Sequence, residues 1–583
     1  MYVRSTTRTS KSGTVRYLQL AHNEWDAAKG RSVPRILYNF GREDALDTDA
    51  IRRLVASLGR LLDPADALTA TAAVAGAGAD LTFTGARPYG GAYVLDQLWH
   101  RLGIGKILTG LASSGRGRPR DAAAAERVLF GLVANRALAP ASKLAAAEWL
   151  SHDVHIDGLG DVDDDACYLA MDWLHSVAGD LEKQVYFQVA DLLNLEVDLL
   201  FFDTTSTYFE TEDPDDGVPR DWRGEPATAG KDAEAGGKDA DPDREGGFRV
   251  HGKSKDSRDD LPQIVIGLAV TREAIPVRVW CWPGNTGDSA LIRQVKKDMR
   301  DWNLGRVIWV ADRGFSSKEN RRFLQQGAGA YIIGEKLRSG STEAQAALSR
   351  AGRYQQVADN LQVKEVRLPD VADRFVVCFN PDAATRDAAI RASLLARLEE
   401  LIVGSDTLPV MKRGELRGKI STIPGLNRFL RVTPGGLLRV DKAKVRTEEN
   451  LDGKYLLRCA DPTLSAQDIA LGYKQLLEVE RGWRDMKTVL ELRPVYHRLE
   501  ERIRAHVLLC WLALLLIRVA ENQAGTTWVR MRRALDRIQL GTFTGPAGSF
   551  QQVTELAKPA RDLLTALRVD PPAAVHRLTI PGT

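Results

Sequence analysis

The sequence predicts an α/β fold in which a mixed sheet carries helices on its faces. Short apolar runs such as VDLLFFDTT, IVIGLAV and RVIWVAD are typical of buried strands, and segments with helical spacing of apolar residues lie between them. A long block rich in Ala and Leu precedes the first of these runs and predicts a helical domain ahead of the sheet.

The composition describes a globular protein of several domains with nearly balanced charge. The chain has 583 residues, of which 44% are hydrophobic and 27% charged. Because the formal net charge is only +3, any nucleic-acid surface has to be a local patch. The five cysteines are far apart and form no zinc-like Cys/His cluster, which fits a reducing cytosol.

Neither a secretory signal nor a membrane span is expected. The first residues, MYVRSTTRTSKSG, contain no apolar core of a signal peptide. The most apolar run, residues 507–517, has 11 residues and is too short to cross a bilayer, so it is predicted to be a buried helix.

Residues 1–64 are predicted to form a small β-rich head, and residues 65–196 a helical domain. In the head, residues 14–22 and 32–40 have strand patterns and residues 48–61 a helical one. The basic start of the head either contacts DNA or is solvated. The helical domain is interpreted, from its position alone, as a DNA-binding module.

A cationic segment, GRGRPR, lies within the helical domain at residues 115–120. It is slim enough to lie in a minor groove. A basic linker before a helix capped by Asp121 explains the same residues, and we favour the linker.

Residues 197–335 are predicted to form the first part of the α/β domain. Two buried strands, 197–205 and 306–312, end at or near Asp203 and Asp312. The expected order is three strands, a helix, a strand, a helix and a strand, and the segments after the first strand are 264–270, 275–282, 288–302, 306–312, 316–326 and 330–334. Residues 211–247, dominated by Gly, Pro, Ala and charge, are predicted to be a flexible loop between strands.

The remaining chain is predicted to be an insertion followed by the second part of the α/β domain. Strand-like pieces surround one helix near residues 385–403, which predicts a β-rich insertion over residues 336–470. Residues 471–583 are expected to complete the α/β domain and to end in helices, including an apolar one at 503–520.

One helix, predicted over Tyr473 to Leu490, places a carboxylate beside a buried stripe. Its apolar residues share one face, and they are Leu476, Val479, Trp483, Met486 and Leu490. Tyr473, Glu480 and Lys487 are seven residues apart, almost two turns, so they align at the edge of that stripe. Such a border is often only a solvated charged face, and the two strand-end aspartates are what favour a functional reading.

Asp203, Asp312 and Glu480 can meet if their strands are neighbours and the helix packs on the sheet. Three carboxylates at one point repel unless cations lie between them. Oxygen ligands without His or Cys select Mg²⁺ or Mn²⁺. A pair of such ions suits displacement at a phosphodiester.

With these residues in place, the chain resembles bacterial insertion-sequence transposases of the DDE type. The resemblance lies in FFDTTSTYFE, GNTGD, VADRGF, LYNFGR, LAPASK, HGKSKDSRDDLPQ and the helix with Tyr473, Glu480 and Lys487. That helix is similar to the family's Y-(2)-R-(3)-E-(6)-K signature, although Leu476 stands at the signature Arg position. The resemblance implies an RNase H-like catalytic domain that is interrupted before the glutamate.

The resemblance also implies roles for individual residues. Asp203, Asp312 and Glu480 would be catalytic metal ligands for Mg²⁺ or Mn²⁺. Tyr473 and Lys487 would contact DNA phosphates. Arg313 and Arg484 are further candidates for phosphate contacts, although a salt bridge to a neighbouring carboxylate explains each of them equally well. Because Leu476 stands at the signature Arg position, one phosphate contact is either lost or supplied by Arg484 or Arg481.

The implied function is a DNA transposase that binds inverted-repeat ends and catalyses strand cleavage and strand transfer. Cut-and-paste through a hairpin is the favoured route. The implied partners are double-stranded DNA, as transposon ends and target, and a second copy of the chain, since two ends need two catalytic centres. The implied location is the bacterial cytoplasm at the nucleoid.

Alternatives remain at this stage. A metal-dependent nuclease on the same fold would cut without joining strands. A non-catalytic DNA-binding protein derived from a transposase would explain the resemblance without chemistry. A glycosidase with paired carboxylates leaves the third acid and Lys487 unexplained.

Other residues near these motifs are not assigned to the site. His497, Trp483 and the basic stretch with His251, Lys253 and Lys255 could each meet DNA. Packing, or a solvated loop for the basic stretch, explains them at least as well.

Overall fold

The computed structural model describes residues 2–10, 13–26, 29–47, 51, 82–112, 119, 121–195, 198–221, 224–226, 245–302, 304, 307–545 and 548–579. Two compact units are present, one with residues 1–85, 542–551 and 575–583, and one with residues 86–541 and 552–574. Most of the expected helix at 48–61, of the cationic segment 115–120 and of the loop 211–247 lies outside the described residues.

The first unit contains a three-stranded antiparallel sheet near the N-terminus. Its strands are β1 (Tyr2–Ser10), β2 (Gly13–Asp26) and β3 (Arg31–Arg42), and the short helix η1 (Glu43–Ala45) follows. The strands expected at 14–22 and 32–40 are therefore confirmed and longer than predicted. β1 was not predicted, because its many basic and polar residues hide a strand that pairs with β2 along its whole length.

The second unit begins with a helical block, as expected. Its helices are α3 (Gly90–Arg101), α4 (Ile104–Leu111), α5 (Ala122–Leu138), α6 (Lys143–Glu148), α7 (Asp164–Ser176) and α8 (Ala178–Leu193), with the π-helical turn η2 (Trp149–Asp153) after α6. Asp121 caps α5 by accepting from the backbone N–H groups of Ala123 and Ala124, which confirms the predicted cap.

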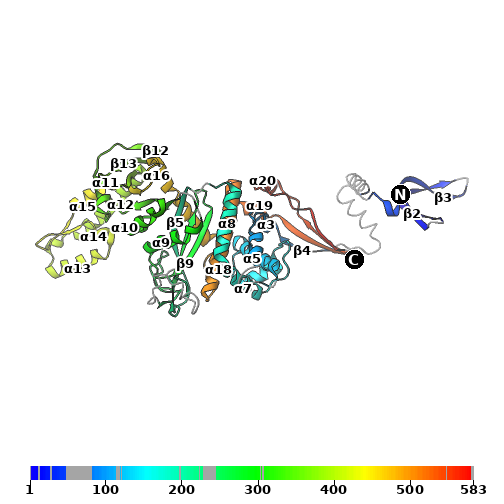
Figure 1. Cartoon of the computed structure of the whole chain (residues 1–583), viewed down its shortest axis with the longest axis horizontal. Helices are drawn as coiled ribbons and strands as arrows, with labels where there is room; N and C mark the ends of the chain where they lie inside the picture. The colour runs from blue at the N-terminus through cyan, green and yellow to red at the C-terminus, as the bar shows by residue number, and fades with distance from the viewer. Residues whose placement is uncertain are drawn as a thin grey trace. The chain divides into compact units, whose positions relative to one another are not determined.

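A nine-stranded mixed sheet forms the centre of the second unit, in the order β12-β13-β14-β17-β11-β10-β5-β8-β9 (Figure 1). The strands are β5 (Leu199–Tyr208), β8 (Gln263–Val270), β9 (Pro276–Pro283), β10 (Ile308–Ala311), β11 (Ala330–Glu335), β12 (Gln355–Ala358), β13 (Leu361–Arg367), β14 (Arg374–Phe379) and β17 (Lys454–Cys459). With α9 (Asp288–Asp298) and α10 (Lys318–Gln325), the predicted order of strands and helices after residue 197 is confirmed.

The two faces of this sheet are covered by different helices. Leu200, Phe202 and Trp309 pack in one apolar cluster with residues of α8, α9 and α10. Leu199 and Phe201 belong to another cluster, which includes residues of the segment after β17. Because successive strand residues point to opposite faces, odd-numbered positions of β5 point toward that segment.

The β-rich insertion expected over residues 336–470 differs from the structure. After α11 (Thr342–Ser349), strands β12, β13, β14 and β17 extend the central sheet instead of forming a subdomain of their own. The chain between β14 and β17 is mainly helical, with α12 (Pro381–Ile402), α13 (Val410–Ser421), α14 (Pro424–Asn427), α15 (Lys442–Glu449) and the hairpin β15 (Leu430–Val432) and β16 (Leu438–Val440). Local strand patterns were visible, but they do not say which sheet a strand joins.

The helix expected over Tyr473 to Leu490 consists of two helices, α16 (Ala466–Lys474) and α17 (Leu477–Thr488). Between them the backbone N–H of Leu476 donates to the Tyr473 carbonyl and that of Val479 donates to the Leu476 carbonyl. These three-residue spacings tighten the chain locally, although no Gly or Pro marks the position. The predicted apolar stripe is confirmed, because all five of its residues are buried.

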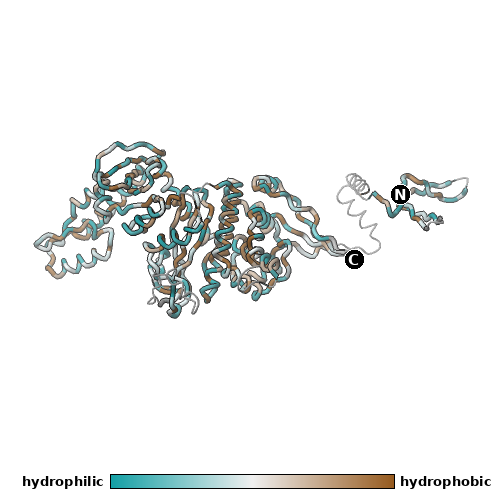
Figure 2. The backbone as a smooth tube through the Cα atoms, in the orientation of Figure 1, coloured by the Kyte–Doolittle hydropathy of each residue, from teal (hydrophilic) through white to brown (hydrophobic). Residues whose placement is uncertain are grey.

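The C-terminal part is less helical than expected. It contains α18 (Glu500–Ala524), α19 (Trp528–Leu535), α20 (Lys558–Ala566) and the strands β18 (Gln539–Gly545), β19 (Gly548–Val553) and β20 (Val575–Thr579). These strands form a sheet with β4 (Thr82–Pro88), in the order β20-β19-β18-β4. Among the described residues, α18 alone is long and apolar enough to cross a membrane (Figure 2). Of that apolar stretch, 94% is buried in the fold.

Candidate active site

Asp203 and Asp312 lie at neighbouring positions of two parallel strands. The register of β5 and β10 pairs Phe202 with Ala311, which is the last residue of β10. Asp203 and Asp312 are the residues that directly follow Phe202 and Ala311, so the two aspartates are neighbours at the point where β10 ends. The sequence prediction that these two strand residues meet is thereby given a geometric basis.

Asp203 does not end its strand, contrary to the expectation. β5 continues for five residues beyond it to Tyr208, paired with β8 down to Gln263. The residues concerned, TTSTY, are polar but mostly β-branched, so they suit a strand without extending the apolar run. Asp203 instead marks the point where the parallel partner β10 stops.

Both carboxylates belong to the sheet face that the α16–α17 segment covers. Asp203 alternates along its strand with the same spacing as Leu199 and Phe201, so it points to the same face of the sheet, and Asp312 does so with Ile308 and Val310. These four apolar residues belong to one cluster. Gly472 of α16 lies over this face, since a Cβ there would come within 2.9 Å of Leu199.

The electrostatics of Asp203 reflect this crowding. Burial raises the pKa of Asp203 to about 6, and the charges of Asp312 and Asp288 act in the same direction. The Lys255 ammonium opposes them. A carboxyl held among other acids in this way is favoured in its ionised form by a nearby cation.

Tyr473 joins Asp312 directly. Its hydroxyl donates a hydrogen bond of 3.1 Å to Oδ1 of Asp312. Burial and the charge of Asp312 raise the pKa of the Tyr473 phenol, so it stays a donor. The helix that carries Tyr473 starts at a capping box in which Ser465 and Asp468 satisfy each other's backbone N–H groups.

Gly334 leaves room for this contact. A Cβ on Gly334, in β11, would lie 2.5 Å from the Tyr473 hydroxyl and 3.3 Å from the backbone nitrogen of Arg313. A side chain at this position would therefore push the phenol away from Asp312.

The loop of residues 251–262 brings a cation to Asp203. Lys255 Nζ lies 4.0 Å from Asp203 Oδ1 and 3.3 Å from Asp288 Oδ2. It also donates to the carbonyl and the hydroxyl of Thr204, at 2.6 and 2.5 Å. The Thr204 hydroxyl in turn donates to Asp288 at 2.8 Å. Lys255 and Asp288 are thus part of the site, although no catalytic role was predicted for either of them from the sequence.

The next residue of that loop holds Lys487. Asp256 accepts from Lys487 Nζ at 2.9 and 3.1 Å and from Arg493 at 3.0 Å. The Lys487 side chain is only 15% exposed. In this structure Lys487 is therefore an ion-paired, half-buried cation, and not a freely exposed one.

Glu480 and Arg484 point outward from α17. Both are exposed, and neither forms an ion pair or hydrogen bond within the described part of the chain, apart from their backbone groups. α17 passes over β8 next to Asp203, because a Cβ on Gly482 would lie 3.1 Å from Leu268, the register partner of Asp203. The structure places the helix of Glu480 beside the two aspartates but shows no contact between the three acids.

The signature position that holds Leu476 is buried. Of the two arginines considered as substitutes, Arg481 is bound to Glu521 at 3.0 Å and to Glu478 at 3.7 Å. Arg484 has no such partner among the described residues and is the better candidate. His497 and Trp483 are buried, as expected if they pack in the core and do not contact DNA. Burial lowers the pKa of His497 to about 3.

The donor set fits a hard divalent cation. Among the described residues, no three His, Cys, Asp or Glu side chains are gathered closely enough to count as a metal cluster. The Lys255 ammonium nevertheless lies among oxygens of Asp203, Asp288 and Thr204, which shows that this point favours positive charge. Carboxylate and hydroxyl oxygens are ligands that Mg²⁺ and Mn²⁺ accept.

Comparisons with known proteins give two family matches. Residues 3–69 match the family described as "IS1634 family transposase, N-terminal domain". Residues 244–516 match the "Transposase DDE domain", which includes Asp312 and Glu480 but begins after Asp203. No curated protein matches the chain.

Solved structures also match, among them one described as "Cryo-EM structure of piggyBac transposase synaptic complex with hairpin DNA (SNHP)". Its identity to this chain is 11% and its TM-score 0.34, over 76% of this chain and 78% of that chain.

Proposed function

We propose that the protein, which is a DNA transposase of the DDE type, cuts the ends of an insertion sequence with Asp203, Asp312 and Glu480 as its catalytic carboxylates. The observation that carries the proposal is the register of β5 and β10, which sets Asp203 beside Asp312 on the face covered by α16 and α17. The domain is of the RNase H-like kind, with Tyr473, Glu480 and Lys487 as its signature residues.

Divalent ions, Mg²⁺ or Mn²⁺, held by these three carboxylates would supply the charge that activates water and stabilises the leaving 3′ oxygen. The protein's own groups prepare the site. Tyr473 fixes one oxygen of Asp312 and leaves the other for a ligand. Lys255 lies close to the carboxylates of Asp203 and Asp288 and balances part of their negative charge.

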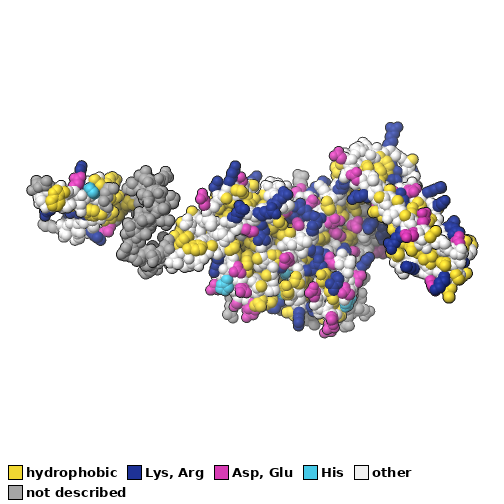
Figure 3. Space-filling view, turned by 180° about the vertical axis from the view of Figure 1, so that it is seen from behind, with side chains coloured by type: hydrophobic (Ala, Val, Ile, Leu, Met, Phe, Trp, Pro, Cys, Tyr) yellow, Lys and Arg dark blue, Asp and Glu magenta, His cyan; other side chains and the backbone are white. Residues whose placement is uncertain are grey.

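DNA phosphates next to the cut would be contacted by Lys487, Arg484 and Arg313. Tyr473 donates its single hydroxyl proton to Asp312, so it would reach a phosphate only by leaving that carboxylate. Arg313 and Arg484 are exposed and unpaired in the described structure, so they are available. Lys487 reaches a phosphate only by sharing or leaving Asp256. On the face seen in Figure 3, Lys and Arg side chains gather near the middle of the second unit, which fits a local DNA surface on a chain of net charge +3.

The freed 3′ hydroxyl then attacks the opposite strand to form a hairpin or attacks target DNA, which gives a cut-and-paste reaction. Two ends have to be cut together, so the active form is a homodimer on DNA.

A cleavage assay tests this function. Duplexes spanning both borders of the protein's own element are mixed with Mg²⁺ and with wild type, Asp203→Asn, Asp312→Asn or Glu480→Gln. We expect cuts at both borders with wild type, and a loss of roughly 10³-fold or more in each variant with DNA binding retained. Cleavage by Asp203→Asn at the wild-type rate would refute the triad.

A further inference from the structure

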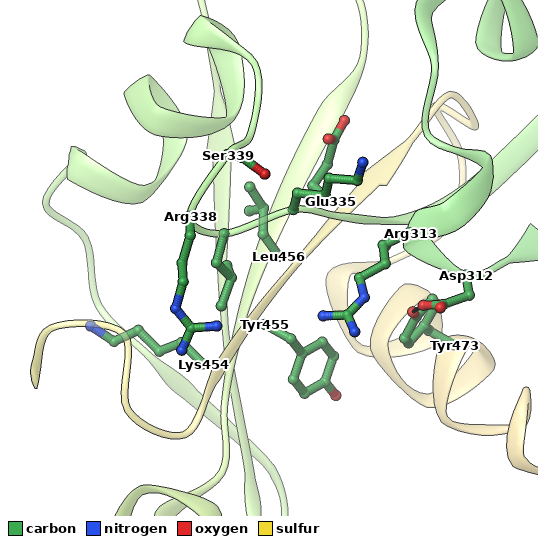
Figure 4. A pocket seen from close by; sticks show the side chains of 12 residues that line it. Asp312, Arg313, Glu335, Arg338, Ser339, Lys454, Tyr455, Leu456 and Tyr473 are labelled. Carbon is green, nitrogen blue, oxygen red and sulfur yellow. Dashed lines mark hydrogen bonds between the residues drawn. The ribbon is translucent and has the colours of Figure 1, made fainter. Parts of the chain in front are cut away.

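A cavity of about 500 Å³ opens next to Asp312 on the side of β11 and β17 (Figure 4). Its wall includes Tyr473 and Arg313 from the catalytic side and Lys336, Arg338, Lys454 and Tyr455 from the other. None of the last four was singled out in the sequence. The cavity is continuous with the proposed reaction centre, because Asp312 itself forms part of its wall.

The charge of this cavity is mainly positive and only partly compensated. Arg313 and Lys336 are exposed, with no carboxylate at ion-pair distance in the described part of the chain. Lys454 donates to a backbone carbonyl, that of Asn450, at 2.6 Å. Arg338 is paired with Glu448 at 2.8 Å.

Acidic groups of the wall do not neutralise these cations. Glu335 lines the cavity, but its carboxylate lies 3.5 Å from Arg321 and 3.6 Å from Arg458, and in Figure 4 it points away from Arg313. Asp312 is held by Tyr473 at the catalytic edge. A polyanion would therefore meet an excess of cations here.

Two aromatic rings line the same space. Tyr455 and Tyr473 stack with ring centroids 6.0 Å apart and an interplanar angle of 27°. In Figure 4 the side chains of Arg313 and Arg338 line the same cavity as the Tyr455 ring. Cations along a groove with aromatic faces between them are the combination that binds a nucleic-acid strand.

We propose that this cavity holds the sugar–phosphate backbone of one DNA strand where it continues past the phosphate cut at Asp312. Lys336, Arg338 and Lys454 contact its phosphates, and Tyr455 packs against a sugar or base. This inference rests on the proposed function, since it takes Asp312 as the point of cleavage. It extends the DNA site from α16 and α17 to β11, β17 and the turn after β11.

Binding without metal tests the inference separately from catalysis. The full chain, with Lys336→Gln and Lys454→Gln combined, is titrated by fluorescence anisotropy into border duplexes over a range of salt concentrations. One duplex includes flanking DNA and the other ends at the border. We expect roughly tenfold weaker binding at about 0.1 M salt and a salt slope smaller by about 1.8, which corresponds to two lost phosphate contacts.

Lys183→Gln is the matched control. Its ammonium donates to the carbonyl of Asp301, which precedes β10, whereas Asp312 follows that strand. It removes one positive charge at the opposite end of β10, compared with two in the double variant, and we expect no change in affinity or slope. The control and an unfolding curve of the double variant separate a local contact from a general charge or folding effect.

Each outcome decides the question. A loss confined to the duplex with flanking DNA supports the proposal and assigns the cavity to the flank, while a loss on both duplexes supports it and assigns the cavity to the element's end. Unchanged affinity and slope in the folded double variant, or an equal loss in Lys183→Gln, would overturn it. If the catalytic triad were wrong, the separate cleavage assay would show it, because Asp312→Asn would still cut DNA in the presence of Mg²⁺.

Discussion

Helix α17 carries two groups of ion pairs that differ in burial and in charge balance. Toward α18, Arg518 is bound by Asp485 at 2.6 Å and by Glu521 at 2.5 Å and is only 1% exposed. Toward the catalytic sheet, Lys487 and Arg493 share the single carboxylate of Asp256, and the three side chains are 15–25% exposed. We refer to these groups as the Arg518 network and the Asp256 network.

The difference indicates two separate tasks on one helix. In the Arg518 network the carboxylates outnumber the cations. Arg518 is bound by Asp485 and Glu521, and Arg481 by Glu521 and Glu478. Such a buried group fixes α17 on α18, and nothing in it is left for a ligand. In the Asp256 network one carboxylate serves two cations, so a phosphate can complete the pairing. We therefore expect the Arg518 network to determine the stability of the fold and the Asp256 network to determine DNA binding and cleavage.

The largest effect is expected from Arg518→Met. The change leaves Asp485 and Glu521 without their buried partner, which should lower the free energy of unfolding by about 3–5 kcal/mol. Urea or thermal unfolding measures it. Arg502→Met is the control, because its pair with Asp172 is more exposed at 29% and 43%. That pair should contribute less than about 1 kcal/mol. Equal losses in the two variants would remove the distinction between a buried network and a surface pair.

Lys487→Gln should affect DNA cleavage more than folding. Losing one charge-assisted hydrogen bond to a phosphate, about 1.5–3 kcal/mol, lowers the cleavage rate roughly 10- to 150-fold. The free energy of unfolding should change by less than about 1 kcal/mol, because Asp256 keeps its ion pair with Arg493. Lys487→Arg should recover part of the activity. A stability loss as large as that of Arg518→Met, with cleavage unaffected, would reverse the assignment of the two networks.

A smaller effect of the opposite sign is expected from Asp256→Asn. Freeing Lys487 and Arg493 from their carboxylate should strengthen binding to duplexes of unrelated sequence several-fold and steepen the salt slope by about 0.9 per added phosphate contact. Asp260→Asn is the matched change in the same loop, since Asp260 pairs with the exposed Arg258 at 2.8 Å. If both variants gained the same affinity, the effect would be one of net charge and not of the Asp256 network.

The smallest expected effect separates two neighbouring arginines. Arg484→Gln should weaken border-DNA binding about threefold without altering stability, since it removes one exposed phosphate contact. Arg481→Gln should leave DNA affinity unchanged and lower stability, because Arg481 is bound to Glu521. Anisotropy and unfolding curves on both proteins check the pair. The reverse pattern would place the substitute for the signature arginine at Arg481.

Much of the catalytic sheet could be predicted from the sequence because its strands are apolar runs of ordinary length. Asp203 and Asp312 stood out since each directly follows such a run. That β5 and β10 pair in parallel, with the two acids level, is a long-range contact that no local pattern contains. The end of β5 was misplaced for a related reason, because its second half is polar but pairs with β8.

Loop residues of the site were the least predictable. Lys255 and Asp256 have neither periodicity nor an apolar neighbourhood, so their sequence suggests a solvated loop. Their roles arise from where the fold puts them, against Asp203 and Lys487. The sequence contained one signal for them, because the stretch HGKSKDSRDDLPQ, which includes Lys255 and Asp256, is among those that resemble the transposase family. The insertion was misjudged because strand propensity does not identify the sheet that β12, β13, β14 and β17 extend.

The central claim is that Asp203, Asp312 and Glu480 surround one divalent-cation site. Fe²⁺ exchanged for Mg²⁺ reduces added hydrogen peroxide to hydroxyl radicals, with ascorbate regenerating Fe²⁺, and these radicals cut the protein backbone beside the bound ion. Mass spectrometry of the fragments locates the cuts. The account predicts cuts near residues 203, 312 and 480 in the DNA-bound protein, all suppressed by excess Mg²⁺ and lost together in Asp203→Asn. Cuts near 203 and 312 with none near 480 would contradict it and leave Glu480 outside the site.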